Sequence, residues 1–168
     1  MKLFMIYIGG AHEKSLIELH DIRFVIADNI EETYEELRCS WWGIPKSLHL
    51  DAFGELIYAD GYRIFLKSTQ NNIKHKLYFL NLGGYSKHEF TELHKNIFIV
   101  AENEDQAKIK AKAQILHWES PHKDYQYELE NILDMTPIAA QKNVHIHLEP
   151  TVNPQKFEFI CQYTSIGK

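Results

Sequence analysis

The chain contains one stretch of sequence twice. KLFMIYIGG, from Lys2 to Gly10, aligns with KLYFLNLGG, from Lys76 to Gly84, at an offset of 74 positions. Continued without a gap from Lys2 to Asn29, this alignment gives ten identities in 28 columns, and eight of the other 18 columns exchange one apolar residue for another. Self-similarity at a fixed spacing is typical of duplicated structural units. We therefore predict two copies of one module.

Later in the chain the two copies align at a different offset. GYRIFLKST, which begins at Gly61, matches NVHIHLEPT, which begins at Asn143, at an offset of 82 positions, so the second copy has gained eight residues. We place the insertion in DMTPIAAQ (134–141), where Pro137 and the small residues after it predict a loop. A further apolar run, KFEFICQY (156–163), predicts a terminal strand without a counterpart in the first copy.

Within each copy the pattern of apolar residues predicts strand, strand, helix, strand, strand. In the first copy the strands are expected at 2–8, 19–27, 48–58 and 62–66, with Asp60-Gly61 as a hairpin turn before the last one. The helix starts are marked by Asn29 with Glu32 and by Asn103 with Gln106. Both pairs have the spacing of a capping box, in which the Asn side chain accepts a hydrogen bond from an early helix amide.

These elements predict an α+β fold with mainly antiparallel sheet. A single module covers only one face of its sheet, so each needs a partner to bury the other face. We expect a first module at 1–68 and a second at 76–168, related by a pseudo-twofold axis and packed as one compact unit.

Charge and hydropathy exclude several classes of protein. The net charge is −5, and the lysines are scattered, which argues against a nucleic-acid binder. No apolar stretch has the length of a membrane span, and the start of the chain lacks the pattern of a cleaved signal, so we expect a cytoplasmic protein that does not bind membranes. Cys39 and Cys161 lie in unrelated contexts and are expected to be buried thiols.

The most interesting shared residues are two Glu-Leu-His triplets. Glu18 and His20 in the first copy align with Glu92 and His94 in the second. Residues two apart on a strand point to the same side, so a carboxylate and an imidazole in this pattern can share a proton or a metal ion. A structural role is the alternative, because His20 shares its predicted strand face with Phe24 and belongs to the core in that case.

A metal is not assigned from the sequence. The chain has no His-Glu-x-x-His motif and no cysteine pair at ligand spacing, and a Glu-His pair supplies fewer than the three protein ligands usual for catalytic zinc. Further ligands have to come from elsewhere. His49 with Asp51, and His145 with His147, show the same alternate spacing.

The paired glycines form a second candidate site. Gly9 with Gly10 and Gly83 with Gly84 each follow an apolar strand, and backbone amides in a glycine loop can approach an anion closely. However, phosphate loops lead from a strand into a helix, whereas these glycines lead toward another strand. A turn with positive φ is the favoured alternative.

Several segments of the first copy resemble a known family. MKLFMIYIGG, IELHDIRFVIADNIEETYEEL, SLHLDAF and ADGYRIFL are similar to a bacterial family described as domain of unknown function 1543, whose members carry one or two copies per chain. The second copy keeps the family's pattern in KLYFLNLGG and ELHKNIFIVAENEDQAK and departs from that pattern after the helix. The resemblance implies the duplication, and it implies no activity, cofactor or site residues.

Two hypotheses about function follow. The first is a non-catalytic binding or interaction module, with a homodimer through exposed strand edges as one form of it, and it predicts no bound metal. The second is a small-molecule enzyme that uses paired Glu and His on strands, with or without a metal. Cofactor, ligand and partner are not identified by the sequence.

Overall fold

The computed structural model describes residues 1–70, 74–85, 88, 90–113, 120–121 and 132–168. It is an α+β protein whose sheets are mainly antiparallel, as predicted. The chain divides into two compact units: unit 1 comprises Met1–Tyr58 and Gln155–Lys168, and unit 2 comprises Ala59–Pro154. No helix in the described residues is long and apolar enough to cross a bilayer.

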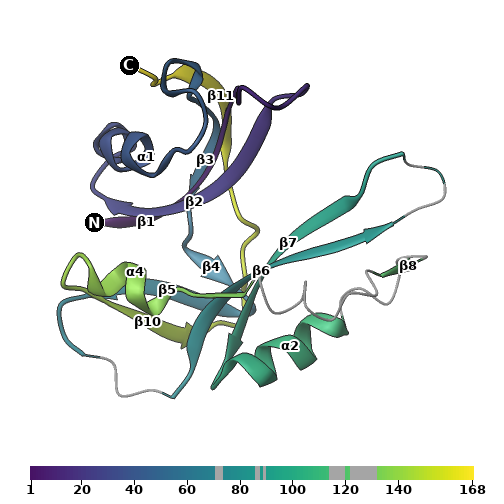
Figure 1. The fold of residues 1–168 in the computed structure, drawn as a ribbon. Coiled ribbons are helices and arrows are strands. Elements are labelled where there is room, and N and C mark those ends of the chain that lie inside the picture. The colour runs from purple at the N-terminus through teal and green to yellow at the C-terminus, as the bar shows by residue number, and fades with distance from the viewer. Residues whose placement is uncertain (71–73, 86–87, 89, 114–119, 122–131) are drawn as a thin grey trace. The chain divides into compact units, whose positions relative to one another are not determined.

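Unit 1 is built on a four-stranded antiparallel sheet with the order β11-β3-β1-β2. Its strands are β1 (Lys2–Gly10), β2 (Leu19–Ala27), β3 (His49–Glu55) and β11 (Ile160–Ser165). The short helix α1 (Tyr34–Ser40) lies against one face of this sheet (Figure 1), between the 3₁₀ turns Glu31–Thr33 and Pro45–Ser47. The other face carries the candidate site.

The core of unit 1 follows from the alternation of β1. Phe4, Ile6 and Ile8 point to the face that α1 covers, and all three are buried with Leu37 of the helix. Trp41, which directly follows the helix, joins the same cluster. Alternate residues of a strand lie on opposite faces, so Tyr7 and Gly9 lie on the other side of the sheet.

Unit 2 has two sheets. In one, β6 (Lys76–Tyr85) pairs with β7 (Leu93–Ala101) and with two short strands, β8 (Ser120–Pro121) and β9 (Ile132–Asp134). Helix α2 (Glu104–Lys112) packs on this sheet through Ala107 and Ala111. The other sheet has the order β10-β5-β4, formed by β10 (His145–Pro150), β5 (Tyr62–Lys67) and β4 (Tyr58–Ala59).

The register between β5 and β10 has the symmetry of a duplicated strand. The two strands run antiparallel with Phe65 opposite His147 at the centre. These two residues also align with each other at the offset of 82 positions. A local twofold relation between the two copies of this strand accounts for the pairing. The duplication of the modules stays a prediction.

Three expectations about elements and side chains were wrong. The insertion at 134–141 is not a loop: Thr136–Ala140 form helix α4, with Pro137 in its first turn, a position where proline's missing N–H is harmless. The last strand is Ile160–Ser165 and therefore begins later than 156. Cys39 and Cys161 are exposed free thiols.

Candidate functional site

Two histidines meet over a glycine on the face of the unit 1 sheet opposite α1. Because β1 is the strand between β2 and β3, Gly9 lies directly opposite His20 on one side and His49 on the other. A Cβ atom at Gly9 would lie 2.7 Å from His20 Cδ2 and 2.7 Å from His49 Nε2. The missing side chain of Gly9 therefore creates the space that both imidazoles occupy.

A bulge in β3 places a carboxylate beside these rings. Tyr7 pairs with Ala52 and Ile8 pairs with Leu50, so the register skips Asp51. An extra residue in one strand redirects its side chain, and such bulges are frequent next to active sites. His49 and Asp51 are two positions apart and therefore share a face of the strand, and the bulge adjusts the direction of the Asp51 side chain beside the rings.

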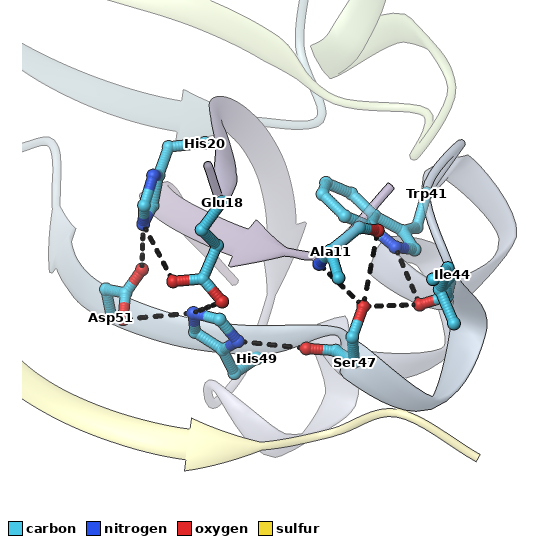
Figure 2. Close-up of polar contacts among 8 residues, drawn as sticks. All are labelled: Ala11, Glu18, His20, Trp41, Ile44, Ser47, His49 and Asp51. Atoms are coloured by element: carbon cyan, nitrogen blue, oxygen red, sulfur yellow. Dashed lines mark hydrogen bonds and ion pairs between the residues drawn. The ribbon is translucent and has the colours of Figure 1, made fainter. Parts of the chain in front are cut away.

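Glu18 approaches the same cluster from just before the start of β2 (Figure 2). Each of its carboxylate oxygens faces one imidazole: Oε2 lies 3.8 Å from His20 Nε2, and Oε1 lies 3.6 Å from His49 Nε2. Asp51 does the same from the other side, with Oδ2 3.4 Å from His20 Nε2 and Oδ1 3.4 Å from His49 Nε2. Two carboxylates thus bracket two Nε2 atoms.

These separations are too long for hydrogen bonds and suit a shared cation. An N–H to O hydrogen bond has about 2.7–3.2 Å between its heavy atoms. A tetrahedral ion bound at about 2.1 Å to each ligand separates neighbouring ligand atoms by about 3.4 Å. Within the described residues, Glu18, His20 and His49 are the group whose donor atoms all lie within 4.8 Å of one another. Asp51 Oδ2 is buried without a hydrogen-bond partner.

A contact at Nδ1, the ring nitrogen that faces away from the carboxylates, fixes the orientation of His49. Its Nδ1 lies 2.9 Å from the backbone carbonyl oxygen of Ser47, which makes Nδ1 the protonated nitrogen and leaves the lone pair on Nε2. The hydroxyl of Ser47 accepts from the amide of Ala11 at 2.8 Å and donates to the carbonyl of Ile44 at 2.7 Å (Figure 2). This arrangement resembles the outer shell that orients metal-binding histidines.

Two tyrosines flank the imidazoles. The ring of Tyr7 stacks on His20 with centroids 5.2 Å apart, and Tyr163 of β11 lies against His49 at 4.7 Å. Burial, and then the negative charges of Asp51 and Asp21, raise the pKa of Tyr7. The Tyr7 phenol therefore stays protonated, and uncharged, at neutral pH.

The site has a buried side and an accessible side. The side chain of His49 is 4% exposed, whereas that of His20 is 33% exposed and that of Glu18 is 48% exposed. An ion held by all three is therefore anchored from within the sheet and reachable by small molecules from solvent.

The second Glu-Leu-His triplet forms a pair of the same kind in unit 2. His94 lies opposite Gly83, as His20 lies opposite Gly9, and His94 Nε2 is 3.6 Å from Glu92 Oε2. The part of the chain between β8 and β9 (122–131) lies outside the described residues. Whether either pair has a function remains a prediction.

The candidate glycine loops are not loops. Gly9 and Gly10 belong to β1, and Gly83 and Gly84 belong to β6. Among the described glycines only Gly61, in the predicted hairpin turn, has a positive φ, so neither glycine pair serves a left-handed turn. Their position in paired strands gives no phosphate loop, because the amides of Gly9 and Gly10 lie within the ladder.

Sequence reasoning noted the spacing of His49 and Asp51 without joining them to Glu18 and His20. The missing link was the register, which brings both histidines opposite Gly9. The bulge at Asp51 depends on tertiary pairing and leaves no pattern in the sequence. The alternating His-x-Asp itself, in the strand expected at 48–58, was the signal that was available.

Comparison with known proteins agrees with the fold and brings no activity. The model of the family described as Domain of Unknown Function (DUF1543) matches residues 15–66, which include Glu18, His20, His49 and Asp51. A solved structure, described as the crystal structure of a protein Il1583 from Idiomarina loihiensis, is 31% identical. It aligns over 99% of this chain and 99% of its own, with a TM-score of 0.72. No curated protein matches the chain. The chain belongs to the DUF1543 family.

Proposed function

We propose that the chain is a metal-dependent enzyme acting on a small molecule, with a divalent transition-metal ion held by Glu18, His20 and His49. The observation that carries the proposal is the set of four contacts of 3.4–3.8 Å between two Nε2 atoms and two carboxylates. Two carboxylates that face two imidazole nitrogens offer a set of donor atoms for a cation between them.

The donor set favours zinc. Imidazole nitrogen suits zinc, iron, copper and nickel, whereas calcium and magnesium prefer sites made of oxygen. Octahedral coordination at about 2.1 Å would bring neighbouring ligand atoms to about 3.0 Å, shorter than any of the four contacts, whereas tetrahedral coordination gives about 3.4 Å. Asp51 supplies a second carboxylate, which adds negative charge at the ion's position.

With Asp51 beside the ion and not bound to it, the three ligands Glu18, His20 and His49 favour catalysis over a purely structural role. Structural zinc sites are usually closed by four protein ligands, whereas catalytic ones keep a position for water or substrate. The exposed side of the site, at Glu18 and His20, leaves room for such a position. The alternative hypothesis, a non-catalytic interaction module, predicts no bound metal and therefore differs in a measurable way.

Metal content tests the proposal directly. Protein stripped with a chelator and then dialysed against Zn²⁺ should retain one equivalent at the site, measured by elemental analysis and calorimetric titration. His20→Ala and His49→Ala should each abolish this binding, while His12→Ala, which removes a half-buried histidine outside the cluster, should not. Equal Zn²⁺ binding by the wild type and both cluster variants would rule the site out.

Cobalt substitution tests whether the site is open. Co²⁺ in a tetrahedral or five-coordinate site gives much stronger visible absorption than octahedral Co²⁺. We expect strong bands that shift when a small competing ligand such as thiocyanate is added. Strong bands that do not respond to any added ligand would indicate a closed structural site and would contradict the catalytic role.

A further inference from the structure

The last strand of the chain, β11, lies at an edge of the unit 1 sheet. β11 pairs with β3 and, within the described residues, with no other strand. Five of its six residues are exposed, including Ile160 and Tyr163, which are 53% and 68% exposed. Its outer backbone groups are therefore available for pairing with another strand.

The sequence of this edge lacks charge and proline, two of the features that oppose such pairing, and its one irregularity is a register shift against β3 between Cys161 and Thr164. From Phe159 to Gly167 there is no charged residue and no proline. The other long edge strands of the described chain are protected: β2 carries Asp21 and Arg23, β7 carries Lys95, and β10 carries Glu149 and Pro150. Charges and proline on an edge strand oppose pairing with other chains. β11 has neither, and in this it differs from β2, β7 and β10.

An apolar groove continues the same surface. It has a volume of about 400 Å³ and lies beside the first residues of β11. Phe159 and Ile160 line it together with Phe4, Phe53 and Ile57, and the charged side chains of Lys2, Glu55 and Glu158 also border it. Exposed apolar area next to an open strand edge gives a partner both backbone hydrogen bonds and a surface to bury.

We propose that two copies of the chain associate through β11, which pairs antiparallel with the β11 of its partner about a twofold axis at Tyr163. In that register Glu158 and Lys168, which flank the strand, come opposite each other in both directions, and Lys168 exchanges its 3.5 Å contact with Glu35 for one with Glu158 of the other copy. Centring the pairing on Gln162 instead would place Lys168 opposite Lys156, with repulsion between like charges. The proposal does not depend on the metal site.

A second copy fits this edge better than an unrelated segment for a physical reason. An isologous interface must be complementary to itself, and an uncharged strand flanked by one acidic and one basic residue meets this condition. A protein of net charge −5 otherwise repels its own copies, so the neutral edge is the place where self-association costs least.

Analytical ultracentrifugation of the full chain tests the interface. We expect a concentration-dependent dimer that Gln162→Lys weakens at least about tenfold, because a lysine on an edge strand opposes pairing. Gln141→Lys is the matched control: it adds the same charge at an exposed position outside β11 and should leave the dimer unchanged. A wild type that stays monomeric at every concentration, or a dimer that Gln162→Lys does not weaken, would overturn the proposal.

Disulfide trapping tests the register separately. Pairing centred on Tyr163 places Ser165 opposite Cys161 of the other copy, within the range that a disulfide spans. In a Cys39→Ser background, Ser165→Cys should give a covalent dimer on a non-reducing gel, whereas Thr164→Cys should give much less. The two cysteines of one chain are about 13 Å apart along the strand and cannot pair with each other. Equal trapping by both variants would contradict this register.

Discussion

Gly9 is the residue on which the geometry of the candidate site depends most directly. The sequence showed a Gly-Gly pair and suggested a loop, but Gly9 lies within β1, under two imidazoles. Its role is to be small, not to adopt a special backbone conformation. That role could not be predicted without the register, because a glycine's neighbours across a sheet are distant in the sequence.

Gly9→Ala should therefore weaken metal binding. The added methyl group would lie 2.7 Å from atoms of both His20 and His49, so at least one imidazole must move away from the shared position. We expect Zn²⁺ affinity, measured against a chromophoric chelator, to fall by about tenfold or more. Gly54→Ala, which meets the backbone of Glu158 in the same sheet, is the control that should lower stability without this specific loss. Unchanged affinity in Gly9→Ala would contradict the assigned geometry.

Ser47 should support the site without touching the metal. Its hydroxyl anchors the turn whose carbonyl accepts from His49 Nδ1. Ser47→Ala leaves that carbonyl in place and removes its support, so we expect about tenfold weaker Zn²⁺ binding with the same stoichiometry. Ser40→Ala, which removes a hydroxyl bonded to the Leu37 carbonyl at the end of α1, should have no such effect. Loss of stoichiometry in Ser47→Ala would instead indicate a direct ligand or a folding defect.

At the scale of elements, local signals predicted well and long-range pairing did not. β2 has the bounds expected from its alternation, and the turn at Asp60-Gly61 has positive φ at both residues, as a two-residue hairpin requires. The insertion was predicted as a loop because Pro137 was taken as a breaker, yet proline in the first turn is compatible with a helix. In the second copy the spacing of Ala107, Ala111, Ile115 and Trp118 predicts one apolar helix face, and Ile115 and Trp118 lie outside the described residues.

The helix cap of α2 gives a prediction about stability. Asn103 Oδ1 accepts a hydrogen bond from the amide of Gln106 at 3.0 Å, as the capping box predicts. Asn103→Ala should lower the free energy of unfolding by about 1 kcal/mol, because one amide of the first turn loses its partner. Chemical denaturation measures the change, and Asn153→Ala, at an exposed position outside the helices, should show almost none. If Asn103→Ala lowered the free energy of unfolding by less than a few tenths of a kcal/mol, water would fully replace the hydrogen bond of the cap.

The ion pair between β6 and β9 should make stability depend on pH. Burial would raise the pKa of Asp134, but hydrogen bonds from Lys76 and Thr136 hold this pKa below its usual range, and the same bond to Asp134 raises the pKa of Lys76. A lowered carboxyl pKa contributes stability above the pKa of the unfolded chain and loses it as pH falls through the folded value. Asp134→Asn should therefore destabilise by at most about 1 kcal/mol at neutral pH and by less in acid.

The corresponding pair in unit 1 is a matched control for this pH dependence. Lys2 lies 3.4 Å from Glu55, and Lys2 aligns with Lys76 in the repeat. The contact is longer than the 2.7 Å between Lys76 and Asp134. Glu55→Gln should lower the free energy of unfolding by less than Asp134→Asn does, as measured by urea titration at neutral and at acid pH. If Asp134→Asn and Glu55→Gln lowered the free energy of unfolding equally at every pH, the shorter Lys76–Asp134 bond would add no stability over the Lys2–Glu55 contact.

At the scale of the whole molecule, the compact units do not follow the repeat. The sequence placed a boundary between 68 and 76, whereas residues 155–168 at the end of the chain belong to unit 1 with the first residues. The cause is strand exchange: β11 pairs with β3, and β5 pairs with β10. Sequence similarity identifies which segments are alike, but it does not determine which segments pair, since either copy offers the same apolar edges.

The division into two units predicts which strands a bound metal ion stabilises. Glu18, His20, His49 and Asp51 all belong to unit 1, and Tyr163 beside them comes from the returning C-terminal segment. A ligand that binds only the folded state stabilises it by about 2.7 kcal/mol at a free concentration one hundred times its Kd. We expect hydrogen exchange to slow on Zn²⁺ addition in β1, β2, β3 and β11, and to stay unchanged in β6 and β7. His49→Ala should remove the effect throughout. Protection that is equal in both units would contradict a site confined to unit 1 and would require the ion to bind elsewhere as well.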